Sequence, residues 1–108
     1  MATTIIALKL IGIAEDGTEC PIEIKVDAPV QKSSQEWVCR FVLKGMKENL
    51  RPNISGNDAF QSLCIAVDFI RFMLDDFLQK GGQLLEADTR EEWPLEAYSM
   101  KVPALLKA

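Results

Sequence analysis

The sequence predicts an α+β domain in which an antiparallel sheet of about four strands, starting with an N-terminal hairpin, carries one long helix on one face. Two patterns of apolar residues and the length of the chain predict this class. Residues 1–56 contain stretches that alternate apolar and polar side chains, which is the period of a strand, whereas residues 57–81 repeat apolar side chains every three or four positions. The 108 residues are the length of one domain, so the strands, the helix and the following segment 82–108 belong together.

The first 28 residues predict a β-hairpin that turns at residues 15–17. A two-residue turn would place Lys9 opposite Ile24 on the apolar face. A three-residue loop with Gly17 in the left-handed conformation keeps apolar side chains together instead. It gives the pairs Leu10–Ile22, Leu8–Ile24, Ile6–Val26 and Lys9–Glu23. Because a slip of one residue turns every side chain to the other face, the apolar pairing favours the three-residue loop.

Three further segments complete the strand prediction. Residues 29–35 hold a proline and several polar residues, which predicts a loop or a ragged edge. A third strand follows over Glu36–Lys44, and a short fourth strand lies within Asn49–Ile54 at a sheet edge, because it contains a proline that cannot donate to a central ladder. After the helix, Gln83–Ala87 predicts one more short strand, followed by an irregular tail.

The helix is predicted from about Asn57 to Gln79, where Gly81 and Gly82 end it. Two overlapping capping signals mark its start, Ser55 with Asp58 and Asp58 with Gln61, and the sequence does not choose between them. The predicted core-facing residues are Phe60, Leu63, Val67, Ile70, Leu74 and Phe77.

Composition argues against an enzyme. The chain has no histidine, which removes the most frequent general acid–base and metal-binding side chain, and no phosphate-binding or nucleophile motif occurs. The three cysteines, Cys20, Cys39 and Cys64, are too widely spaced for a zinc motif. We therefore expect no catalytic residue, no cofactor and no metal site, and keep an enzyme or small-ligand binder only as an unfavoured alternative.

Charge and hydropathy indicate the compartment and the class of partner. The formal charge of −4 falls entirely in residues 57–108, and no basic patch typical of nucleic-acid binding is present. The sequence contains no apolar run of the roughly 20 residues that a membrane span requires. An odd, sparse set of cysteines favours the reducing cytoplasm. We expect a cytoplasmic protein whose partners are proteins, with no nucleic-acid or membrane partner.

Trp37, Cys39 and Gly45, followed by the run Gly56-Asn-Asp-Ala-Phe-Gln-Ser-Leu63, come after the Asp-Gly hairpin. In these features the chain resembles a family of small uncharacterised bacterial proteins, a domain of unknown function. The resemblance covers roughly residues 5–86 and implies strands followed by a long helix. It implies no activity, cofactor or site residue.

The helix carries a second apolar stripe that one sheet cannot also cover, formed by Ile65, Phe69 and Phe72. Either the tail covers it, or a second copy of the chain does. The tail residues available for this are Trp93, Leu95, Tyr98, Leu105 and Leu106. The sequence leaves open whether Trp93 is exposed. Together with the three residues of the stripe, Trp93 completes the candidate interface. The outer face of the hairpin is also apolar, through Ile5, Ile11 and Ile13, which favours association. Our leading expectation is therefore a non-enzymatic interaction protein that self-associates.

A second candidate surface is acidic and consists of Glu86, Asp88, Glu91, Glu92 and Glu96. Only Arg90 relieves this run of negative charge. Such a surface suits a basic partner, because complementary charge accelerates encounter. The alternative function is thus an immunity- or antitoxin-type protein that binds a basic partner through its acidic C-terminal half.

Overall fold

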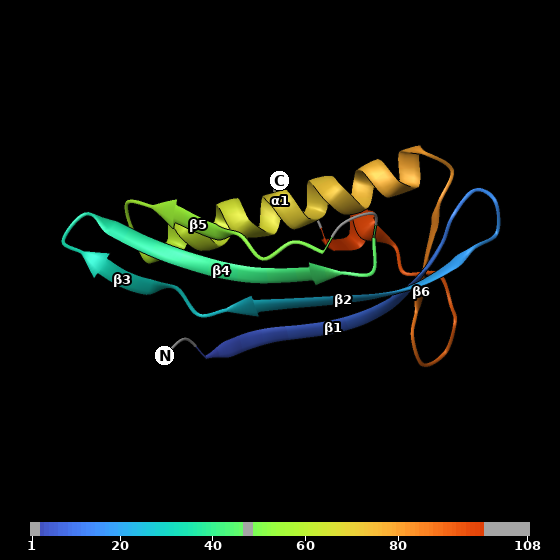
Figure 1. Cartoon of the computed structure of the whole chain (residues 1–108), viewed down its shortest axis with the longest axis horizontal. Coiled ribbons are helices and arrows are strands. Elements are labelled where there is room, and N and C mark those ends of the chain that lie inside the picture. Colours follow the sequence, from blue (N-terminus) through green and yellow to red (C-terminus); the bar gives the residue numbers. More distant parts are fainter. Residues whose placement is uncertain (1–2, 47–48, 99–108) are drawn as a thin grey trace, which may run out of the picture.

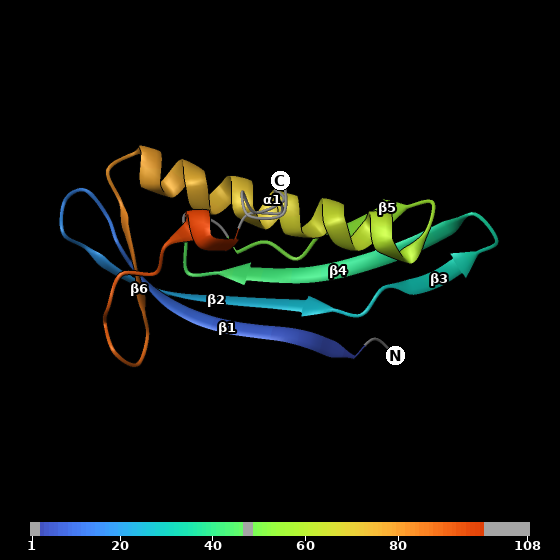
Figure 2. The ribbon, with the colours of Figure 1, turned by 180° about the vertical axis from the view of Figure 1, so that it is seen from behind.

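The structure of the chain is a computed structural model that describes residues 3–46 and 49–98. Its elements in chain order are β1 (Thr4–Ile13), β2 (Glu19–Asp27), β3 (Val30–Ser33), β4 (Glu36–Lys44), β5 (Asn53–Gly56), α1 (Ala59–Gln79), β6 (Gln83–Glu86) and the 3₁₀ helix η1 (Leu95–Tyr98). The strands form an antiparallel sheet, and α1 lies along one side of it (Figures 1 and 2). The α+β class is confirmed, but the sheet has six strands where about four were expected.

Strand β4 is paired along both of its edges. Val38 pairs with Val30 of β3 on one edge and with Ser55 of β5 on the other. The second half of β4 pairs with β2, which leads directly into β3, and β2 pairs in turn with β1 and β1 with β6. β5 therefore lies at one side of the sheet, as the proline of this segment predicts. It spans Asn53–Gly56, whereas the strand was expected within Asn49–Ile54.

Residues 29–35 were predicted to form a loop or a ragged edge, and the structure has the edge strand β3 there, with a register shift between Gln31 and Ser33. The composition of this segment is polar, and Pro29 interrupts the chain between β2 and β3. β4 nevertheless extends beyond the end of β2, so its first residues need hydrogen-bonding partners along that edge. Val30 and Gln31 supply them by pairing with Val38 and Trp37. The pairing closes a short hairpin between β3 and the start of β4, which the polar composition of the segment does not reveal.

The predicted hairpin register is confirmed. In the β1–β2 ladder Leu10 lies opposite Ile22, Leu8 opposite Ile24 and Lys9 opposite Glu23. Gly17 has a φ of 88°, the left-handed conformation that the three-residue loop requires. The inner face of the hairpin is consequently apolar, whereas Lys9 and Glu23 share the outer face.

Helix α1 begins at Ala59, and the structure identifies Asp58 as its N-cap. The Asp58 carboxylate accepts a hydrogen bond from the Gln61 backbone N–H at 2.7 Å, and the Gln61 side chain accepts one from the Asn57 N–H at 2.7 Å. The Ser55 hydroxyl is used elsewhere and donates to the Glu36 carboxylate. Of the two capping signals, the second therefore applies, and the helix starts two residues later than predicted.

The predicted core stripe of the helix is confirmed in part and departs from the structure at the start of the helix: Ile70 and Leu74 are buried, and Leu63 and Phe77 pack against the core. The buried residues of α1 are Ser62, Ala66, Ile70 and Leu74. Phe60, which was predicted to face the core, is 73% exposed, and this prediction is wrong. The cause is the close approach of β5, because a Cβ at Gly56 would lie 2.6 Å from the Ser62 nitrogen. Small side chains at positions 62 and 66 permit this contact, and the helix turns them toward the sheet.

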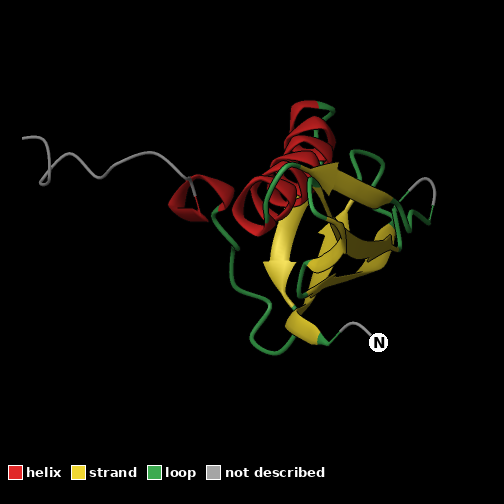
Figure 3. Ribbon diagram, turned by 90° about the vertical axis from the view of Figure 1, so that its left-hand side faces the viewer, coloured by secondary structure: helices red, strands yellow, loops and turns green. Residues whose placement is uncertain are grey.

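The core lies between the sheet and α1 and is completed by the segment after β6. Its fully buried members on the strands are Leu10, Ile22, Ile24, Val26, Cys39, Phe41, Leu43 and Leu84. Trp93 and Leu95 belong to the same core, and Figure 3 shows η1 beside α1. Trp93 is held there because its backbone N–H donates to the Leu84 carbonyl at 2.8 Å and its ring stacks on Tyr98, with centroids 4.4 Å apart.

Candidate interaction surfaces

The second apolar stripe of α1 lies at the surface. Ile65, Phe69 and Phe72 are 41%, 39% and 67% exposed. At about 100° per residue, Ile65 and Phe72 point within roughly 20° of one another, so they form one face. Phe69 lies at the border of this face, where its ring contacts that of Phe41 with centroids 5.6 Å apart. We refer to Ile65, Phe69 and Phe72 as the α1 stripe.

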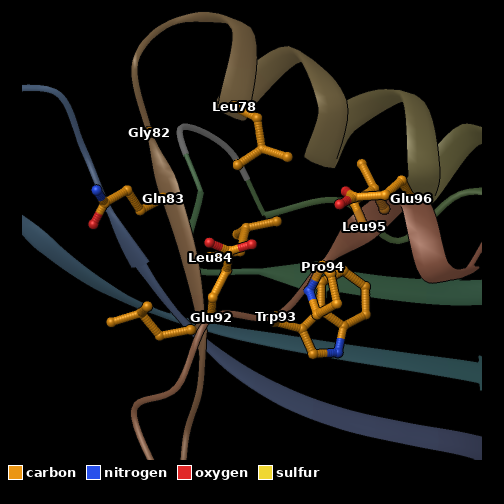
Figure 4. A pocket seen from close by; sticks show the side chains of 10 residues that line it. Leu78, Gly82, Gln83, Leu84, Glu92, Trp93, Pro94, Leu95 and Glu96 are labelled. Atoms are coloured by element: carbon orange, nitrogen blue, oxygen red, sulfur yellow. The ribbon is translucent and has the colours of Figure 1, made fainter.

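The segment after β6 packs on the other side of α1. Leu78 and Leu95 line one cavity of about 300 Å³ beside β6, which Figure 4 shows from close by. Leu78 follows Phe69 by nine positions on the helix, so these two side chains point roughly 180° apart. The segment 93–98 therefore leaves the α1 stripe uncovered. Leu105 and Leu106, the other residues considered as a cover, lie outside the described residues.

Trp93 does not share a surface with the α1 stripe. Its side chain is only 6% exposed and belongs to the core. The structure thus decides the question that the sequence left open, since the ring faces inward in the folded chain. The apolar residues Trp93 and Leu95, two positions apart, were the available signal for this burial, because a buried segment presents apolar side chains at short intervals.

The acidic residues divide between two cavities. Glu92 and Glu96 line the cavity beside Leu78 and Leu95 (Figure 4). Glu86 and Asp88 line a second cavity of about 420 Å³ next to β1. Glu91 is exposed on the turn between them, and the neighbouring Arg90 is engaged by the Glu19 carboxylate. The acidic residues therefore lie on both sides of Trp93, which lines both cavities.

Cys39 is the one buried thiol of the three cysteines, all of which are free. Its Sγ lies 3.4 Å from the Asp27 carbonyl oxygen, to which it donates. Burial, followed by the negative charge of Asp27, raises the pKa of the Cys39 thiol above its ordinary value. A thiol held in its neutral form is a poor nucleophile and a poor metal ligand, so this residue packs the core.

Within residues 3–46 and 49–98, no three cysteine, aspartate or glutamate side chains are grouped so that they could hold a metal ion. Over the same ranges, α1 and η1 both lack the combination of length and apolarity that crossing a membrane demands.

Comparison with known proteins yields one family. A family model described as a domain of unknown function, DUF6968, matches residues 8–95. The expectation of an uncharacterised domain family is thereby confirmed, and the match extends beyond the expected residues 5–86 to include Trp93 and Leu95 of the core. No curated protein and no solved structure matches the chain. Because the match spans most of its length, the chain belongs to the DUF6968 family.

Proposed function

We propose that this protein is a non-enzymatic interaction module that self-associates through the α1 stripe. The exposure of Phe72, at 67%, beside Ile65 and Phe69 is the observation that carries this proposal. Adjacent large apolar side chains lose contact with water when a partner covers them, at about 25 cal/mol for each Å² buried. The described tail segment packs on the opposite side of the helix, which favours a second chain as the cover.

The position of the stripe suits an antiparallel copy of the same helix. Phe69 is the middle residue of Ala59–Gln79. A two-fold axis near Phe69 would bring Ile65 of each copy against Phe72 of the other, because the two residues lie at nearly equal distances on either side of it. The contact would therefore be self-complementary, as a symmetric dimer requires.

The test is the mass of the protein in solution, measured by light scattering on a sizing column. Phe72→Asp should convert a dimer into a monomer, because it places a charge at the centre of the contact. Phe60→Asp is the matched control: Phe60, at 73%, is about as exposed as Phe72 on the same helix but points roughly 120° away from it. A monomeric wild type at high concentration, or equal effects of the two variants, would refute self-association through this stripe.

A reducing compartment, the cytoplasm, is part of the proposal. Cys20, Cys39 and Cys64 are all free, and Cys39 is fully buried in the core. Free thiols persist where glutathione and thioredoxin keep them reduced. Their state in protein extracted under conditions that trap thiols tests this part directly.

The acidic surface supports a second candidate, the immunity- or antitoxin-type binding of a basic partner. Because Arg90 is engaged by Glu19, the exposed carboxylates of Glu91 and Glu92 stand without a neutralising neighbour on their own turn. A decalysine probe should bind wild type in a salt-sensitive manner and bind Glu91→Lys/Glu92→Lys more weakly. Asp68→Lys/Asp75→Lys makes the same change in net charge on α1. Equal losses in both double variants would show that net charge alone matters.

A further inference from the structure

Strand β1 has a partly free edge. β6 pairs only with Leu10–Ile13 of β1, and within the described ranges no strand pairs with that edge over Thr4–Lys9. The two isoleucines of this stretch, Ile5 and Ile6, are 50% and 42% exposed. Natural sheets usually protect a free edge with proline, charges or a bulge that turns it away. Here a bulge lies near Thr4, but the residues from Ile6 to Leu8 are apolar and in regular register.

The ladder register identifies the backbone groups that face this free edge. Ile11 lies opposite Pro21, which has no N–H, so this is a pair without mutual hydrogen bonds. Such pairs alternate with hydrogen-bonded pairs along an antiparallel ladder. Ala7 and Lys9 therefore belong to the same set as Ile11, and their N–H and C=O groups point away from β2, toward the free edge. The pairing of Leu10 with Glu86 engages the Lys9 carbonyl, so the N–H and C=O of Ala7 and the N–H of Lys9 are the groups available to an additional strand.

A cavity of about 420 Å³ lies beside the same edge. Its lining includes Leu8 and Leu10 on the inner face of β1, the stacked rings of Trp93 and Tyr98, and the carboxylates of Glu86 and Asp88. Tyr98 is itself exposed. The cavity thus joins an apolar, aromatic wall to an acidic end, next to unpaired backbone groups.

The positions of these side chains predict the spacing of a ligand. Glu86 lies opposite Leu10, so both residues are on the inner face, together with Leu8. In an added strand, alternate side chains enter this face at intervals of two residues. One apolar side chain would lie opposite Ile6, which is exposed. The side chain two residues along would lie opposite Leu8, beside the aromatic rings and next to Glu86 and Asp88, where a positive charge is favoured. The place opposite Leu10 is taken by Glu86 itself.

We propose that the edge Thr4–Lys9 binds, by strand addition, an extended segment of a partner protein in which an apolar residue and a lysine or arginine are two positions apart. Main-chain hydrogen bonds to Ala7 and Lys9 would supply affinity, and the cavity would supply specificity. A second copy of β1 fits less well, because symmetric pairing of two β1 strands keeps Lys9 of both copies on the outer face, away from Glu86.

Selection from a phage-displayed library of random heptapeptides against the full chain tests this proposal. Selected peptides should share the apolar-x-basic pattern and should slow hydrogen exchange at the Ala7 and Lys9 amides. Ala7→Pro should weaken them roughly tenfold, because it removes one hydrogen bond to the added strand. Ala7→Pro removes no hydrogen bond to β2, so the fold is retained. The matched control is Ala7→Val, which keeps the backbone N–H.

A second comparison leaves the protein backbone unchanged. In the selected peptide, methylation of the backbone nitrogen that faces β1 should abolish binding. Methylation of the next backbone nitrogen, which faces away from β1, should not. Glu86→Lys should weaken the selected peptide but not a version with alanine in place of its basic residue. Failure to enrich any peptide, insensitivity to Ala7→Pro, or slow exchange at Ala7 and Lys9 in the free protein would each overturn the proposal.

The oligomeric state separates this inference from the proposed dimer. A dimer that Phe72→Asp splits and Ala7→Pro leaves intact agrees with both proposals. A dimer that only Ala7→Pro splits would assign the β1 edge to a second copy, which overturns the foreign peptide as its occupant. Peptide binding by a monomeric wild type would refute the α1 dimer and leave the β1 site established.

Discussion

The carbonyl oxygen of Pro21 packs directly against Gly45, at the end of β4: a Cβ built on Gly45 would lie 1.8 Å from it. Gly45 also has a φ of 94°, in the region that favours glycine, and its N–H donates to the Asn49 side chain. The contact fixes where the chain leaves β4 beside β2. It therefore ties the hairpin to the connection that leads into β5 and α1.

Gly45→Ala should lower the free energy of unfolding far more than Gly17→Ala, as measured by urea denaturation. Both glycines have positive φ, which costs an alanine about 1–2 kcal/mol. Only Gly45 has backbone atoms in the space of the new methyl group, which adds about 1–3 kcal/mol of overpacking, since nothing lies within 4 Å at Gly17. Equal losses in the two variants would contradict the close contact with Pro21.

Burial of Cys39 should make stability fall in alkaline solution. The folded chain raises the pKa of this thiol above that of the unfolded chain, whose cysteines ionise near about 8.5. Between these two pKa values the unfolded state loses a proton that the folded state keeps, so the free energy of unfolding decreases as pH rises. Below the unfolded pKa both states hold the proton and this contribution does not change with pH.

The measurement is the pH dependence of urea unfolding for wild type and Cys39→Ala. The variant should be less stable at neutral pH, because it leaves a cavity, but its stability should fall less steeply above pH of about 8.5. Cys20→Ala is the control, since the Cys20 side chain is only partly buried. Parallel alkaline slopes for wild type and Cys39→Ala would argue against a raised thiol pKa.

Truncation of Trp93 should damage the fold, whereas truncation of its stacking partner should not. Trp93 is buried in the core, so Trp93→Ala should cost about 3–5 kcal/mol of unfolding free energy. Tyr98 is exposed and contributes mainly its ring contact, so Tyr98→Ala should cost about 1 kcal/mol. Acrylamide quenching of the Trp37→Phe variant, whose fluorescence comes from Trp93 alone, gives an independent check. Strong quenching, or a small loss on Trp93→Ala, would contradict the burial of this ring.

The candidate surfaces were only partly predictable from sequence. Helical spacing alone places Ile65, Phe69 and Phe72 on one face, and the structure leaves that face exposed. The β1 edge was signalled only by the apolar residue Ile5 on the outer hairpin face. This edge is free because β6 pairs with β1 only as far as Leu10. The length of β6 is set by the turn of the chain after Glu86, and no pattern within β1 reports where that turn occurs.

The sequence by itself determined the hairpin register, the central strand over Glu36–Lys44 and a helix ending at Gln79. These features depend on neighbouring residues, because periodicity, turn chemistry and caps act over a few positions. Only the tertiary structure decided that residues 30–33 pair with β4, that Phe60 faces solvent and that Trp93 enters the core. Each of these outcomes depends on pairing and packing in three dimensions, which composition and periodicity do not report: the edge of β4 that continues beyond β2, the close approach of Gly56 to Ser62, and the space beside the inner face of β1.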